Sequence, residues 1–286
     1  MELCDILIDF ANERENIRVN RLKGKNVLTF DPILGRFRFC NVRRRHDRVS
    51  HWLIENYYRN NVGDVWFRAL IARVINWPPT LQYLMEKKVI PTLASEFNPD
   101  AFIAAMDELR STNVKLYSSA YIVYPTRAKG NSKAENMTRM IIAPAIEKGE
   151  KLRTHISFGS IEKFVNELAS SFGIKTFIAG QVAADLTYIH GQLDNAYDLY
   201  SWAPMGPGSR RGLNRLYNRP LKKAIKEGDF NRELVAVRGE LIRSNKMFED
   251  LTLHDVQNVM CEFDKYVRVM NNEGKPRQLY RPEGAF

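Results

Sequence analysis

Apolar residues recur at intervals of three and four along most of this chain, and this helical spacing constrains the fold more than any other feature. After Asp47 the spacing is met by Val49, Trp52, Leu53 and Tyr57. The same spacing predicts further helices, at about 1–20, 64–76, 79–88, 98–109, 134–149, 160–171, 175–190, 209–226, 231–243 and 254–269. Asn98 before Pro99 fits the start of one of them.

Few segments alternate in the way that a strand requires, and Tyr117–Tyr124 is the chief candidate. The polar, basic stretch 125–133 predicts a mobile loop between two helical lobes. We therefore expect a mainly α, multi-helical, two-lobed domain with one or two short strands. The predicted boundaries are an N-terminal helix or extension over 1–27, a single helical catalytic domain over 28–270 and an extended C-terminal tail over 271–286.

The formal net charge of +10 favours a polyanionic partner, either nucleic acid or an anionic membrane surface. The chain contains neither a run of eighteen apolar residues nor a basic, signal-like start, which predicts a cytoplasmic protein that does not enter a membrane. Its three cysteines are scattered and its five histidines are dispersed. This spacing predicts neither a disulfide framework nor a structural metal.

Basic residues concentrate in two segments, which favours nucleic acid over a merely soluble surface. The first cluster is interleaved with Phe37 and Phe39, and it contains Arg36, Arg38, Arg43, Arg44, Arg45 and Arg48. The second contains Arg210, Arg211, Arg215, Arg219, Lys222, Lys223 and Lys226. Arginine donates paired hydrogen bonds to phosphate, and aromatic rings can stack on bases.

The second cluster begins at a glycine-rich turn, Gly206-Pro207-Gly208, just before a predicted helix. Such a turn lets backbone N–H groups approach a phosphate, and it resembles the hairpin of helix–hairpin–helix DNA glycosylases. We therefore predict DNA contacts at Gly206, Gly208, Ser209, Arg210, Arg211 and Arg215. The sequence contains no GxxxxGK[ST] phosphate-binding loop, which argues against phosphoryl transfer from ATP through such a loop.

Two predicted helices carry carboxylates among apolar neighbours. Gln181 and Asp185 are four residues apart and share a face, and Asp264 lies in the run Cys261–Tyr266. An aspartate in such a helix is either a structural hydrogen-bond anchor or a group prepared for proton transfer. The sequence leaves both interpretations open.

Four segments occur in order: Phe39-x-Asn41-Val42-x-Arg44-x-x-Asp47-Arg48-Val49, Phe177-x-Ala179-x-Gln181-Val182-x-x-Asp185-Leu186, Gly206-Pro207-Gly208-Ser209-x-Arg211-Gly212-Leu213 and Cys261-Glu262-Phe263-Asp264-Lys265-Tyr266. Together they resemble the α-glutamyl/putrescinyl thymine pyrophosphorylase family of phage amino acid:DNA transferases, which is related to the helical domain of 5-hydroxymethyluracil DNA kinases. The resemblance covers about residues 28–278, and it departs from the family pattern at Arg43 and His46. It implies a DNA-glycosylase-like helical fold in a bacteriophage protein of the host cytoplasm.

The resemblance implies a transferase that acts on double-stranded DNA carrying a modified uracil. A kinase first activates 5-hydroxymethyluracil, and this chain then replaces the pyrophosphate with an amine, either an amino acid or a polyamine. The base must leave the helical stack, the pyrophosphate needs cations, and the amine must lose a proton. Magnesium could accompany the pyrophosphate, and the scheme requires no other cofactor.

The resemblance also assigns roles to residues at the matching positions. Substrate and pyrophosphate are assigned to Asn41, Arg44, Arg48, Gln181 and Lys265, with Arg210 and Arg211 as further cations. The candidate general bases are Asp185, Asp47 and Asp264. Asp185 is favoured, because Asp47 begins a predicted helix and Asp264 lies beside the cation Lys265.

Two alternatives remain open from the sequence. A base-flipping, glycosylase-like enzyme would release a free base and leave an abasic site, although the lysine or aspartate of such enzymes is missing after the Gly206 turn. A non-catalytic DNA-binding partner of a hydroxymethyluracil kinase would leave the DNA unaltered with every amine.

Overall fold

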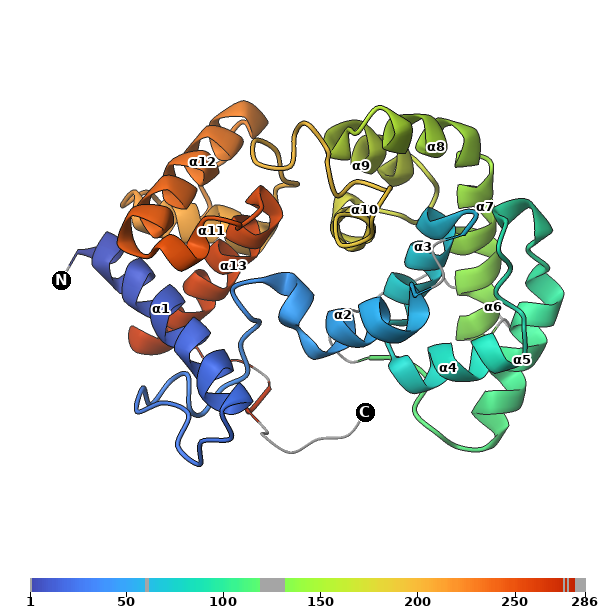
Figure 1. Cartoon of the computed structure of the whole chain (residues 1–286), viewed down its shortest axis with the longest axis horizontal. Helices are drawn as coiled ribbons and strands as arrows, with labels where there is room; N and C mark the ends of the chain where they lie inside the picture. The colour runs from blue at the N-terminus through green and yellow to red at the C-terminus, as the bar shows by residue number, and fades with distance from the viewer. Residues whose placement is uncertain (1, 60–61, 119–131, 275, 277, 281–286) are drawn as a thin grey trace. The chain divides into compact units, whose positions relative to one another are not determined.

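The structure, a computed structural model, describes residues 2–59, 62–118, 132–274, 276 and 278–280. The chain divides into two compact units (Figure 1). Unit 1 combines Met1–Asp47 with Tyr200–Ala285, and unit 2 contains Arg48–Leu199. Segments from both ends of the chain therefore share the core of unit 1.

Four long helices form unit 1, and helices from the two ends of the chain pack together in it (Figure 1). They are α1 (Leu3–Leu22), α11 (Pro207–Leu216), α12 (Glu227–Ser244) and α13 (Leu253–Met270), with the short 3-10 turns η1 (Arg44–His46) and η5 (Lys246–Phe248). The core contains buried aromatic residues from three of these helices, including Phe10, Phe230 and Phe263. Their burial stabilises the unit by roughly 1.5–3 kcal/mol for each side chain.

α11 lies unusually close to α13, because two of its glycines face that helix. A Cβ atom at Gly208 would overlap the side chain of Cys261, and one at Gly212 would overlap the carbonyl of Met260. α13 itself begins with a reciprocal cap, in which Thr252 and Asp255 each accept a hydrogen bond from the other's backbone amide. These contacts fix the α11–α13 pair.

Unit 2 consists of short helices around α10, which packs against α3 and α9 (Figure 1). Its elements are α2 (Arg48–Trp52), η2 (Leu53–Tyr57), α3 (Val65–Ile75), α4 (Pro78–Glu86), η3 (Ala94–Glu96), α5 (Pro99–Ser111), α6 (Lys133–Met137), η4 (Thr138–Ile142), α7 (Ala143–Ile146), α8 (Gly149–Ser157), α9 (Ile161–Ala169) and α10 (Thr176–Leu186). Asp198 accepts hydrogen bonds from the amides of Ile161 and Glu162, both at 2.9 Å. This places an anion at the positive end of α9.

The mainly helical fold is confirmed, and so is the cap of α5, where the Asn98 side chain accepts from the amides of Asp100 and Ala101. The helix predicted at 209–226 is shorter, because α11 ends at Leu216 and is followed by Asn218 in a left-handed conformation and by Pro220. The helix predicted at 134–149 is divided by the π turn η4, directly before Pro144.

The strand predicted at Tyr117–Tyr124 is not present at Tyr117 and Ser118, and its other residues lie outside the described part of the chain. Residues 125–131 of the predicted loop also lie outside it, whereas Lys133 begins α6 after its cap Ser132. Within the described ranges, the extended pairing is a single antiparallel bridge between Phe37 and Leu279. No described helix has the length and apolar character needed to cross a membrane.

Candidate functional site

The segment 39–47 of unit 1 is folded around the side chains of Asn41 and Asp47. Asp47 Oδ1 accepts hydrogen bonds from the Asn41 backbone amide at 2.7 Å and from its side chain at 3.2 Å. Asn41 Nδ2 also donates to the His46 carbonyl at 2.7 Å, and Arg14 Nη2 donates to Asn41 Oδ1 at 2.8 Å. Two residues that the sequence predicted as site residues therefore define the shape of this segment.

Arg44 connects this segment to α13. Its backbone amide donates to Asp255 at 2.8 Å, its Nη1 donates to Asn258 Oδ1 at 3.3 Å, and its Nε lies 3.2 Å from Asp47 Oδ2. Burial raises the pKa of Asp255, an effect opposed by the hydrogen bond from the Arg44 amide. Burial and the nearby Arg44 charge lower the pKa of His254 to about 3.

The Cys261–Tyr266 run meets the same segment one to two turns further along α13. Glu262 accepts from the Cys40 amide at 3.0 Å and forms an ion pair with Lys265. Lys265 donates to the Arg38 carbonyl at 2.9 Å, and its ammonium lies 4.4 Å from the Phe39 ring centroid. Two sequence motifs about 220 residues apart thus form one polar cluster, which we call the Arg44 cluster: Arg14, Asn41, Arg44, Asp47, Asn258, Glu262 and Lys265.

Sequence reasoning did not single out Arg14, Asn258 or Glu262 as site residues. A signal was present for the last two, because His254, Asn258 and Glu262 are polar residues spaced by four in an otherwise apolar helix. The partner of Arg14 lies 27 residues away in a loop, so no helical period could reveal it.

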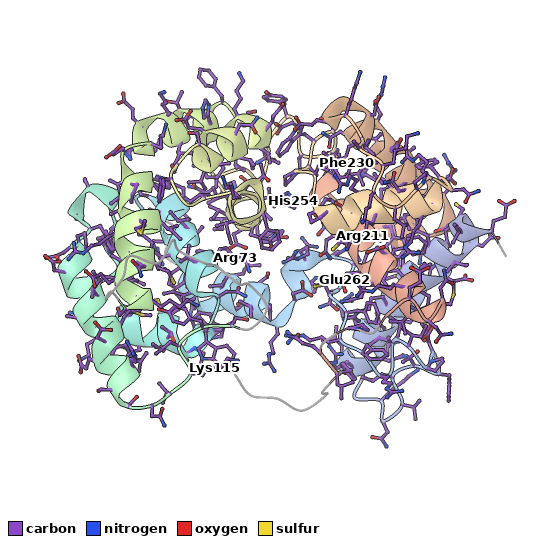
Figure 2. The ribbon with its side chains drawn as sticks, turned by 180° about the vertical axis from the view of Figure 1, so that it is seen from behind. Arg73, Lys115, Arg211, Phe230, His254 and Glu262 are labelled. Atoms are coloured by element: carbon purple, nitrogen blue, oxygen red, sulfur yellow. The ribbon has the colours of Figure 1, made fainter. Side chains whose placement is uncertain are left out.

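Asp264 is held by two arginines of α11. Arg211 Nε donates to Asp264 Oδ2 and Arg215 Nε to Asp264 Oδ1, both at 2.8 Å. Arg215 also pairs with Glu273, and this pairing lowers the pKa of Glu273 to about 2. Figure 2 marks Arg211 on α11 and Glu262 on α13. These ion pairs reinforce the close packing of the two helices.

The predicted DNA-binding turn has mixed surroundings. Gly208, Ser209 and Arg215 are buried, whereas Gly206, Arg210 and Arg211 are partly exposed. Arg210 Nε is buried and has no hydrogen-bond partner among the described residues. Packing against α13 accounts for Gly208 and Gly212, so these glycines have a structural reason besides any approach to phosphate.

The first basic cluster is largely neutralised within unit 1. Arg43 is buried and pairs with Asp250 and Glu15, and Arg45 pairs with the same Asp250. Arg36 and Arg38 remain exposed. The free positive charge in this segment is therefore smaller than the sequence indicates.

Asp185 and Gln181 belong to α10 in unit 2, as does Arg48 at the start of α2, whereas the Arg44 cluster belongs to unit 1. Arg73 Nε and Tyr58 Oη each donate to Asp185 Oδ2 at 2.7 Å, and Arg73 Nη2 pairs with Oδ1. The Asp185 side chain is 1% exposed. Burial, with a further contribution from the Asp185 charge, raises the pKa of Tyr58 well above its ordinary value.

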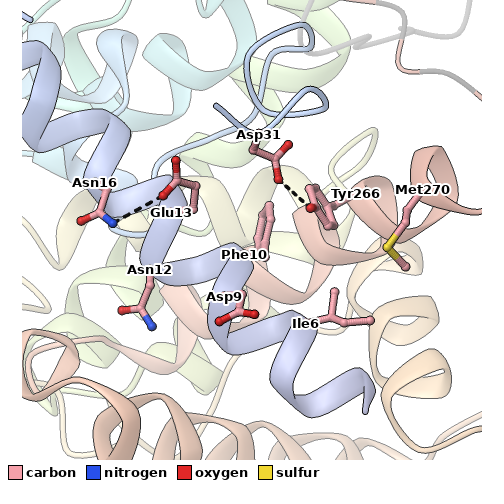
Figure 3. A pocket seen from close by; sticks show the side chains of 9 residues that line it. All are labelled: Ile6, Asp9, Phe10, Asn12, Glu13, Asn16, Asp31, Tyr266 and Met270. Atoms are coloured by element: carbon pink, nitrogen blue, oxygen red, sulfur yellow. Dashed lines mark hydrogen bonds between the residues drawn. The ribbon is translucent and has the colours of Figure 1, made fainter. Parts of the chain in front are cut away.

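A pocket of about 470 Å³ lies on the opposite side of Phe10 and Tyr266 in unit 1, and it is lined by Asp9, Glu13 and Asp31 (Figure 3). Tyr266 Oη donates to Asp31 Oδ2 at 2.7 Å, and Glu13 accepts from Thr29. These bonds fasten the segment around residue 30 to α1 and α13. No group of three His, Cys, Asp or Glu among the described residues is arranged to hold a metal ion.

The family described as 5-hmdU DNA kinase, helical domain, matches residues 1–276. The chain belongs to this family. A member among the curated proteins is the 5-hmdU DNA kinase of Bacillus phage SP10, which is 25% identical over 227 residues. The match covers 72% of this chain but 34% of the relative, so the chain spans about a third of that kinase. No solved structure matches.

Proposed function

We propose that this chain acts on 5-hydroxymethyluracil bases in DNA, in the step in which an amine replaces the pyrophosphate of an activated base. The observation that carries the proposal is the Arg44 cluster, in which two distant motifs place cations, carboxylates and amides together. Membership of the 5-hmdU DNA kinase helical-domain family supports modified thymine in phage DNA as the substrate class.

In the proposed reaction the bond between the 5-methylene carbon and the pyrophosphate oxygen breaks, and its electron pair leaves with pyrophosphate. Arg44 and Lys265 stabilise the charge that develops on this leaving group. The amine nitrogen forms the new bond to carbon and gives its proton to a carboxylate. The described residues offer no cage for magnesium, so no step depends on one.

Among the three candidate carboxylates, geometry favours Asp47 as the base. Its side chain is 19% exposed, compared with 1% for Asp185 and 2% for Asp264. Asp185 and Asp264 each use both carboxylate oxygens to bind arginine. We therefore assign proton transfer to Asp47, and we assign Asp185 and Asp264 to holding their helices.

The test is a reaction with duplex DNA that carries the pyrophosphate ester of 5-hydroxymethyluracil. The purified chain is supplied with single amino acids and polyamines, and the nucleosides are then analysed by mass spectrometry. The proposal expects a nucleoside heavier by the amine, an intact strand and released pyrophosphate. Release of a free base with an abasic site would contradict it and would indicate a glycosylase.

A second candidate function is a non-catalytic DNA-recognition partner of a kinase. It is favoured by the match to about a third of a kinase and by the lack of a GxxxxGK[ST] loop in this sequence. In that case the DNA stays unaltered with every amine, whereas addition of the chain to a separate 5-hydroxymethyluracil kinase raises phosphorylation of the DNA. The same DNA and the same nucleoside analysis separate the two functions.

A further inference from the structure

Two large aromatic side chains are exposed on the turn that joins α9 to α10 in unit 2. Phe172 is 59% exposed and Phe177 is 50% exposed. Both lie within six residues of each other, at the point where the chain reverses between two packed helices (Figure 1). Exposed phenylalanine is costly in water, so a pair of them marks a candidate contact surface.

The main chain of this turn is fixed, so the exposure does not come from a loose loop. Ser171 and Ile174 are buried, and the Ile174 amide donates to the Ser171 carbonyl at 3.2 Å. Gly173 adopts a left-handed conformation with φ +77°, and a Cβ atom there would lie 2.9 Å from Ile141 Cγ1. The inner side of the turn is thus anchored to unit 2 while the rings of Phe172 and Phe177 remain at the surface.

The charge around these rings is positive. Residues 170–177 contain Lys175 and no acidic residue, and the first turn of α10 contains no acidic residue either. Lys175 occupies the cap position without a side-chain hydrogen bond to the helix amides. The first-turn amides have no acceptor within the helix, and their partial positive charge favours an anion. Aromatic rings beside a positive helix end fit nucleotides, which combine a flat base with a phosphate.

We propose that the turn 170–177 is a DNA-contact site, at which Phe172 and Phe177 stack on the bases of locally opened DNA. The inference rests on the DNA-binding part of the proposed function and not on amine transfer. Rigidly held rings compensate for the stacking that the DNA loses when a base leaves the helix. The phosphate next to the stacked nucleotide lies at the amino end of α10.

The experiment compares the full chain with Phe172→Ser, Phe177→Ser and the double variant. Phe158→Ser is the matched control, because Phe158 is 70% exposed in the same unit but lies outside this turn. Binding is measured by fluorescence anisotropy with duplex DNA that contains 5-hydroxymethyluracil. A 2-aminopurine beside that base reports opening of the helix, because its fluorescence rises when it is unstacked.

We expect each single variant to lose affinity by about fivefold or more, the double variant to lose more, and the 2-aminopurine signal to fall with them. The control should bind like the parent, and all variants should keep the parent melting temperature. Binding by the double variant within twofold of the parent, or an equal loss in the control, would overturn the inference while leaving the proposed function intact. If the parent does not bind DNA, both fail. If the double variant loses binding but no amine is transferred, only the transferase proposal fails.

Discussion

Arg73 and Asp185, which are 112 residues apart in the sequence, form an ion pair that is closed to solvent inside unit 2. Arg73 Nη2 also donates to Ser50 Oγ at 2.9 Å, and its Nη1 donates to Asn76 Oδ1 at 3.3 Å. The pair therefore joins α2, α3 and α10, with Tyr58 as a further donor to the carboxylate. Its place in the packing argues for a structural role of Asp185, the residue that the sequence favoured as the base.

Replacing Asp185 with asparagine should destabilise the protein. The change leaves the Arg73 charge buried without its counter-charge, and breaking such a pair costs about 3–5 kcal/mol. We expect a fall in melting temperature of more than about 5 °C, and a loss of activity that matches the fraction unfolded. Asp100→Asn is the control, because that carboxylate forms an exposed ion pair with Arg139. An Asp185→Asn protein with the parent melting temperature but a hundredfold lower turnover would restore Asp185 as the base.

Replacing Asp47 with asparagine should separate chemistry from folding. The amide oxygen can still accept the hydrogen bond from the Asn41 backbone, but the side chain can no longer take a proton from an amine. We expect near-normal DNA affinity and a decrease in turnover of roughly a hundredfold or more. Single-turnover assays with pyrophosphorylated DNA measure the rate, and anisotropy measures the binding. Unchanged turnover would remove Asp47 from the reaction.

The helical period of the sequence predicted most of the helices, because each depends on residues only three or four positions apart. It could not predict the π turns η2 and η4, which follow from how neighbouring helices pack. The close approach of α11 to α13 also depends on residues about 50 positions apart, so the glycines at 208 and 212 resembled those of a phosphate-binding turn.

The arginine cluster at 36–48 shows the same limit for the site. Its sequence density indicated free positive charge, but Arg43 pairs with Asp250, which lies 207 residues later. In contrast, the Asn41-x-x-Arg44-x-x-Asp47 spacing did mark residues that contact one another, since all three lie within one short segment. Local pairing is visible in a sequence, whereas neutralisation by distant partners becomes visible only in the fold.

Arg210 and Arg211 should respond differently to charge reversal, although they are neighbours in the predicted DNA-binding turn. Arg210→Glu should weaken DNA binding at least tenfold and reduce the dependence of affinity on salt concentration, because one phosphate contact is lost. Arg211→Glu places a second carboxylate beside the buried Asp264, so it should also lower the melting temperature. Anisotropy titrations at several salt concentrations and thermal unfolding measure the two effects. Equal DNA affinity of the parent and Arg210→Glu would show that the turn does not contact phosphate.

His254 should make the protein less stable in mild acid. In the folded chain its pKa is lowered to about 3, mainly by burial and further by Arg44, from an ordinary value of 6.5. The neutral ring is therefore favourable above pH 6.5, and its contribution is lost as the pH falls towards 3, because the unfolded chain binds a proton that the folded chain does not. Over that window the free energy of unfolding should decrease by up to about 1.4 kcal/mol per pH unit for this one proton.

Urea unfolding between pH 7 and pH 4 measures this dependence. The His254→Gln variant should show a slope against pH that is smaller by about one proton, whatever its stability at pH 7. His51→Gln is the control, because that side chain is exposed and should leave the slope unchanged. His46, whose pKa burial lowers to about 4, contributes a second proton that both variants retain, so the parent and the control should share the steeper slope. Identical slopes in the parent and His254→Gln would mean that the His254 ring titrates in the folded chain as it does in the unfolded one, contrary to its buried position beside Arg44.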